Sequence, residues 1–64
     1  MLNKYVLRGC ESGAIYRKME LRFTPSAALQ KMWLKQNGDP KERVAIIKLV
    51  EYKGKVFENR VGLI

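Results

Sequence analysis

Few side chains in this sequence could carry out catalysis. The chain has no histidine and only one cysteine among its 64 residues. Nucleophilic catalysis by Ser12 or Ser26, the only serines, would lack its usual imidazole base. Cys10 has no second thiol for a disulfide, and one cysteine cannot build a zinc site from a single chain. We therefore expect a protein that is not an enzyme and that carries neither a cofactor nor a metal ion.

Positive charge is the chemistry that the chain has in excess. Thirteen lysines and arginines stand against six acidic residues and give a net charge of +7. Such a field attracts acidic partners, and lysine and arginine neutralise the phosphates of nucleic acids. Exposed aromatic rings among the cations would add a platform for unstacked bases. The composition therefore favours the binding of an acidic partner over the conversion of a substrate.

The elements that position these side chains are expected to form a single domain spanning residues 1–64. Hydrophobic residues make up 47% of the chain, which predicts a folded protein rather than a disordered basic tail. The longest apolar run, residues 44–47, is too short to span a membrane, and the N-terminal segment has no signal-peptide core. A lone cysteine suits a reducing compartment, so we expect a cytoplasmic protein without a membrane partner.

The first half of the chain predicts two strands joined by a loop. Residues 3–8 and 14–23 are the strands, and residues 9–13 are a glycine-bracketed connection of hairpin length. Along the second strand, one alternating set is mostly apolar and is expected to pack: Ile15, Met19, Leu21 and Phe23. The intervening set is mostly polar and is expected to face water: Tyr16, Lys18, Glu20 and Arg22. Arg17 falls on the packed side, so we expect it near the sheet margin with its guanidinium in water.

A helix is predicted from residue 24 to about residue 36. Thr24 can cap its first amides, Pro25 is tolerated at the first helical position, and Asn37-Gly38 would end it. Four residues at helical spacing share the face that is expected to pack, with Trp33 as the anchor of the core: Leu29, Met32, Trp33 and Gln36.

The segment after the helix is open to two interpretations. Residues 39–42 resemble a helix start, with a capping aspartate, a proline, and a glutamate three residues after the cap. Residues 44–52, however, are rich in β-branched and aromatic side chains, and Lys53-Gly54 separates them from residues 55–58 as a hairpin turn would. We favour strands, which gives the order ββαββ. The predicted fold is a small α+β domain, a four-stranded antiparallel sheet with one helix packed on one face.

One helix covers only one face of such a sheet, so function depends on which side chains point away from it. Residues 44–52 offer two alternating sets, and residues 43, 45, 47, 49 and 51 suit the core slightly better. With that register, the uncovered face is basic and has interleaved tyrosines, and the predicted binding residues are Tyr16, Lys18, Arg22, Lys48, Tyr52 and Arg60. Val56 would lie among them, joined by Lys4 and Arg8 if the first strand agrees.

Single-stranded nucleic acid is the partner that this face fits best. The plain alternative is that the charges only solvate the surface of a small protein. A second alternative is a small accessory protein, of the kind found in phages and mobile elements, that docks on an acidic host protein and inhibits or modulates it. Its contact would be Leu34, flanked by Lys31 and Lys35. A third is a homodimer that covers the aliphatic residues of the same face: Ile46, Val50 and Val56.

Overall fold

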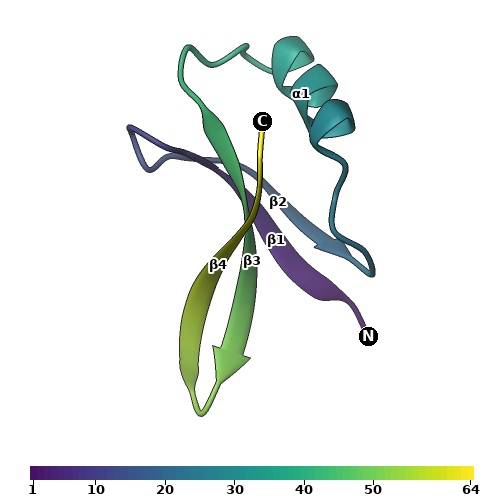
Figure 1. Ribbon diagram of the computed structural model, residues 1–64, viewed down its shortest axis with the longest axis vertical. Coiled ribbons are helices and arrows are strands. Elements are labelled where there is room, and N and C mark those ends of the chain that lie inside the picture. The colour runs from purple at the N-terminus through teal and green to yellow at the C-terminus, as the bar shows by residue number, and fades with distance from the viewer.

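The computed structural model describes all 64 residues as one antiparallel sheet and one helix (Figure 1). The elements follow the order β1 (Asn3–Gly9), β2 (Ile15–Leu21), α1 (Ala27–Gln36), β3 (Val44–Tyr52) and β4 (Lys55–Leu63). The strands lie in the order β2-β1-β3-β4, so the two hairpins join through β1 and β3. The predicted α+β fold and its ββαββ order are confirmed.

The helix is shorter than predicted at its N-terminus. Its N-cap is Ser26, whose Oγ accepts a hydrogen bond from the Leu29 N–H at 3.4 Å, and not Thr24. The hydroxyl of Ser26 directly precedes two alanines, the best helix formers, so the helix starts there. Asn37 caps the C-terminus and Gly38 takes a φ of 115°, which ends the helix where the sequence predicts. α1 is too short and too polar to cross a membrane.

The buried face of α1 differs from the predicted one. Leu34 and Gln30 are buried, whereas Leu29 and Met32 are 62% and 59% exposed. The reason is a polar interaction with the sheet, because Arg17 donates a hydrogen bond from Nη1 to the side-chain oxygen of Gln30 at 3.0 Å. That bond satisfies the buried Gln30 side chain. Leu34, one helical turn later, lies on the same face of α1 and is buried in the core. Leu34 is only 4% exposed, so its predicted role as a surface contact for a protein partner is wrong.

Arg17 lies on the edge strand β2, at the sheet margin as predicted, and its guanidinium packs against an aromatic ring of α1. Its guanidinium carbon stands 4.6 Å from the centroid of the Trp33 ring, and both residues are half-buried. A guanidinium on an indole face gains cation–π attraction and still keeps some solvent. The pair therefore joins β2 to α1 without a charge buried alone.

The connection after the helix is a turn, not a second helix. Asn37 and Gly38 form a turn, residues 41–42 form a bend, and Asp39 takes a left-handed φ of 43°. The favoured strand over residues 44–52 is confirmed, and β4 runs to Leu63, past the predicted end at residue 58. Lys53 and Gly54 both have positive φ, 50° and 76°, so they form the predicted two-residue hairpin turn.

The register of β3 is opposite to the predicted one. Leu7 pairs with Ile46, both are fully buried, and they form the helix-side cluster with Leu34. The complete helix-side cluster comprises Tyr5, Leu7, Leu34, Val44 and Ile46. The set predicted to face the helix, residues 45, 47 and 49, forms a second cluster on the other face with Val6. Both alternating sets are apolar in the middle of β3, and the branched side chains of Val44 and Ile46 reach α1 where Ala45 is too short.

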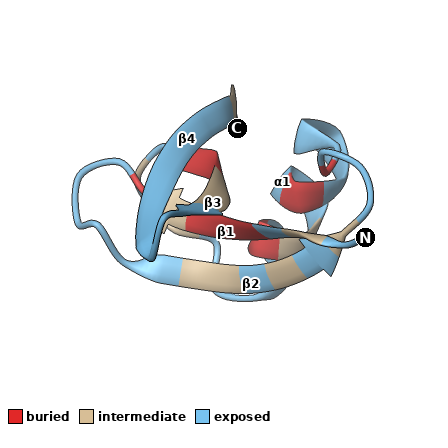
Figure 2. Ribbon diagram, turned by 90° about the horizontal axis from the view of Figure 1, so that it is seen from below, coloured by how far each residue is buried: buried red, intermediate tan, exposed pale blue.

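The sheet face opposite α1, the open face, has no helix over it. Buried residues are concentrated in β1 and the first part of β3, while β4 is exposed almost throughout (Figure 2). The second cluster, Val6, Ala45 and Ile47, is nevertheless buried on this face. The Arg8–Glu58 ion pair, with 2.9 Å between Nη2 and Oε1, links β1 to β4 across β3 on the same side. The aliphatic stem of Arg8 lies beside Val6 on this face.

An irregularity in the first hairpin changes the faces of two predicted residues. The pairing shifts between Leu7 and Arg8, so that Arg8 lies opposite Ile15 and Tyr16 has no partner. Such a bulge reverses the alternation beyond it. Ile15 therefore lies on the open face instead of the packed one, and Tyr16 packs against the helix-side cluster instead of pointing outward.

Candidate nucleic-acid interface

The six predicted binding residues are spread over different parts of the molecule. Lys48 and Tyr52 lie together on the helix-side face of β3. Every second residue of a strand points to the same side, and Ile46, two positions before Lys48, is in the helix-side cluster. Lys18 and Arg60 lie on the open face, because they pair with Val6 and Ile47. Tyr16 also lies on the helix-side face, but in the first hairpin, where it bonds to Glu42, and Arg22 lies just past the end of β2.

The outer half of the β3–β4 hairpin projects beyond the helix and forms an arm, residues 48–59 (Figure 1). Three rungs of this arm place their side chains on the helix-side face, which we call the arm face. They are Lys48 with Asn59, Val50 with Phe57, and Tyr52 with Lys55. Since α1 lies at the other end of the sheet, nothing covers the arm face near the turn (Figure 1).

Two aromatic rings are exposed on the arm face. Tyr52 is 60% exposed and Phe57 is 47% exposed. They occupy neighbouring rungs on different strands, a diagonal relation in which Cα atoms are about 7–8 Å apart. Two exposed rings on neighbouring rungs of one face offer flat apolar surface of the kind on which unstacked bases lie.

Lysines surround these rings without an acidic residue among them. The ammonium of Lys53 lies 5.3 Å from the centroid of the Tyr52 ring, in cation–π range. Lys48 belongs to the first of the three rungs and Lys55 to the last, the one next to the turn. Glu51 and Glu58, the two acidic residues of the arm, pair with open-face residues and so point to the other side. The arm face thus combines uncompensated positive charge with exposed aromatic surface.

Tyr16 is withdrawn from the surface by the carboxylate of Glu42. The Tyr16 hydroxyl and the Ser12 hydroxyl each donate a hydrogen bond to Oε2 at 2.6 Å, and the N–H groups of Glu11 and Ser12 donate to Oε1 at 2.9 Å. The hydrogen bonds from Ser12 and then Tyr16 lower the pKa of Glu42 from 4.5 to about 2. The same bond to Glu42 raises the pKa of Tyr16 above its usual value of 10. Glu42 thereby fastens the β1–β2 loop to the segment that follows α1.

Arg22 lies just past the end of β2, at the sheet edge opposite β4, so it is remote from the arm. It is exposed, and its carbonyl accepts a 3.5 Å hydrogen bond from the side chain of Asn3. Lys31 and Lys35 are exposed on α1. Both border the small hollow beside Leu34, and α1 lies at the end of the sheet away from the arm (Figure 1).

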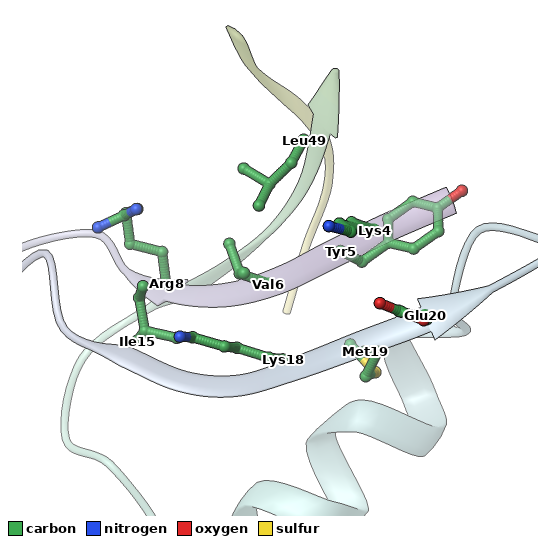
Figure 3. A pocket seen from close by; sticks show the side chains of 9 residues that line it. All are labelled: Lys4, Tyr5, Val6, Arg8, Ile15, Lys18, Met19, Glu20 and Leu49. Carbon is green, nitrogen blue, oxygen red and sulfur yellow. The ribbon is translucent and has the colours of Figure 1, made fainter. Parts of the chain in front are cut away.

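The open face carries a hollow of about 530 Å³ over β1, β2 and β3 (Figure 3). Its apolar lining includes Val6, Ile15 and Leu49, and three cations stand around it: Lys4, Arg8 and Lys18. Arg8 is already engaged, because it pairs with Glu58 and donates from Nη1 to the Gly13 carbonyl at 2.8 Å. Glu20 also borders the hollow, so this face is mixed in charge rather than uniformly basic.

Phe57, Lys53 and Lys55 are not among the predicted binding residues, and Val56 was predicted to lie beside Tyr52. The structure pairs Val56 with Glu51 on the open face, and Phe57 takes the position near Tyr52. A signal for this was present in the sequence. A two-residue turn at Lys53-Gly54 makes residues 52 and 55 partners, which puts 50, 52, 55 and 57 on one face whatever the register of β3 against β1.

No family model, curated protein or solved structure matches this chain.

Proposed function

We propose that the protein binds single-stranded nucleic acid on the arm face, without catalysing a reaction. The observation that supports this best is the exposed pair Tyr52 and Phe57, set among three lysines with no acidic residue on the same face. Bases would stack on the two rings. Phosphates would lie against Lys48, Lys53 and Lys55.

Double-stranded partners fit the arm face less well. Its aromatic rings offer flat stacking surface, which is useful only where bases are unpaired and accessible. The cytoplasm is the compartment we assign, because Cys10 is a free, exposed thiol and such thiols persist in reducing surroundings.

Fluorescence anisotropy with a labelled single-stranded oligonucleotide, measured at several salt concentrations, tests the proposal. Three lysine–phosphate contacts predict a slope of log affinity against log salt of about −2, since each contact on a single strand contributes about −0.7. A fourfold rise in salt should then weaken binding roughly 20-fold. Absence of binding at low salt would overturn the proposal.

Matched variants separate the arm from general electrostatic attraction. Lys55→Gln should make the salt slope less steep by about 0.7, whereas Lys31→Gln, which removes the same charge from α1, should leave it unchanged. Phe57→Ala should weaken binding about 5- to 150-fold through the loss of one stacked base. Phe23→Ala removes an exposed ring outside the arm and is its control.

Two outcomes would point elsewhere. Equal losses for Lys55→Gln and Lys31→Gln would mean that only net charge matters and that the arm face is not the site. Retention of an acidic protein from nuclease-treated lysate, with no oligonucleotide binding, would favour an accessory protein that docks on that partner.

A further inference from the structure

The chain exposes more surface than a monomer of its size should. A folded monomer of this mass is expected to expose about 4200 Å². This chain, at 7.4 kDa, exposes 4888 Å². The excess, about 700 Å², is close to the roughly 800 Å² that each partner contributes to a standard protein interface. Only 11 of the 64 residues are buried, so the core is thin in the way that self-association commonly compensates in small domains.

The open face carries aliphatic side chains that nothing covers. Val56 is 63% exposed and Ile15 is 44% exposed, at opposite ends of this face. Leu63 is exposed near the end of β4, and Leu49 is half-buried beside the hollow. No aromatic side chain is among them, in contrast to the arm face, so this surface offers packing rather than base stacking.

The charge of the open face is nearly balanced. Its basic residues are Lys4, Arg8, Lys18 and Arg60, and its acidic residues are Glu20, Glu51 and Glu58. Four positive and three negative charges leave +1 on this face, against +7 for the chain. The other surfaces therefore hold most of the excess.

This balance identifies the occupant. An acidic partner would gain most from the strongly basic surfaces and little from a face of net charge +1. Two copies of a chain with net charge +7 repel each other as wholes, and this repulsion is smallest when they meet through surfaces that are nearly neutral and of mixed sign. Interspersed lysines and glutamates on one face can also pair with the same face of a second copy, as a two-fold interface requires.

We propose that the open face is a homodimer interface, on which a second copy of the chain packs sheet against sheet about a two-fold axis. The hollow of about 530 Å³ beside Ile15 has room for side chains of the partner. In the dimer, each copy covers the exposed Val56 side chain on the arm of the other copy. The arm faces then point away from the interface, so dimerisation leaves both free. This inference does not depend on the proposed nucleic-acid binding.

Light scattering of the untagged full chain across concentrations from low micromolar to near millimolar tests it, without nucleic acid present. The mass should rise towards twice the monomer mass. The double variant Ile15→Ser/Val56→Ser should remain monomeric, and Tyr52→Ser/Phe57→Ser, which changes the opposite face, should dimerise as the wild type does. Circular dichroism checks that both variants keep their strands and helix.

A second variant guards against a loss of folding in the first. Glu20→Lys/Glu51→Lys changes two exposed residues and raises the charge of the open face from +1 to +5. Dimerisation should be lost at low salt and recovered at high salt, which an unfolded chain would not show. A wild-type chain that stays monomeric at every concentration would overturn the proposal. So would assembly that survives both open-face variants, or that is lost only in the arm-face variant.

Discussion

Leu34→Ala is the substitution that most directly tests how the helix is attached. Leu34 is only 4% exposed, and it is the one apolar side chain of α1 that is buried in the helix-side cluster. Replacing a buried leucine by alanine costs about 2–5 kcal/mol, less where the surroundings can relax. A hollow of about 160 Å³ with a partly charged lining borders Leu34, so the site can relax and admit water. We therefore expect a loss near the lower end, about 2–3 kcal/mol.

That loss is large for a chain of this length. A domain of 64 residues is typically stable by about 3–10 kcal/mol. The melting temperature should fall by roughly 8–24 °C, since each kcal/mol corresponds to about 4–8 °C in a domain of this size. Urea denaturation followed by circular dichroism measures the free energy of unfolding, and an unchanged slope against urea would show that the unfolded state is the same.

Leu29→Ala is the matched control, with the same chemical change on the same helix. Leu29 is 62% exposed, and alanine is the best helix former, so the free energy of unfolding should change by less than about 0.5 kcal/mol. An equal loss of stability in Leu29→Ala and Leu34→Ala would contradict the burial of Leu34 as the anchor of α1. That result would mean that the face of α1 predicted from apolar spacing, which includes Leu29, is the one that packs on the sheet.

Three further results are expected. Glu42 has a pKa of about 2 in the folded chain and an ordinary value of 4.5 when unfolded. Its ionised carboxylate therefore stabilises the fold above about pH 4.5, and this contribution is lost as pH falls towards 2. In Glu42→Gln, acid unfolding should lack that pH-dependent loss of stability. Gly9→Ala should lower the melting temperature, since the added methyl would lie 2.6 Å from the Glu42 carboxylate and displace it from its donors. Arg17→Met should cost about 0.5–2 kcal/mol in urea denaturation and change the fluorescence of Trp33, because both the ring contact and the hydrogen bond to Gln30 are lost.

The order of elements was predictable because local signals agree with one another along most of the chain. Strand 44–52 is dense in β-branched residues, and two positive-φ positions at Lys53-Gly54 suit a tight turn. The helix start was predicted two residues early, because Thr24 and Ser26 both offer a capping hydroxyl and only the structure shows which one is used.

The faces were harder to predict, since three long-range features decide them. Both alternating sets of β3 are apolar, so periodicity alone does not say which meets the helix. The bulge beside Arg8 moves Ile15 and Tyr16 to the faces opposite to those that a strict period of two predicts. Arg17 of β2 donates a hydrogen bond to Gln30 of α1, which allows Gln30 to be buried. The spacing of apolar residues along α1 cannot predict that bond.

The arm is the exception, because its faces follow from the hairpin alone. A two-residue turn fixes Tyr52 opposite Lys55, and the period of two then assigns Val56 and Phe57 to opposite faces. These neighbours consequently belong to surfaces of different character, the mixed-charge open face and the basic, aromatic arm face. The prediction that positive charge gathers on the uncovered side of the sheet is therefore wrong, since that side carries a net charge of only +1. The positive charge that remains unopposed near exposed rings is on the arm, and substitutions at positions 56 and 57 should change dimerisation and nucleic-acid binding independently.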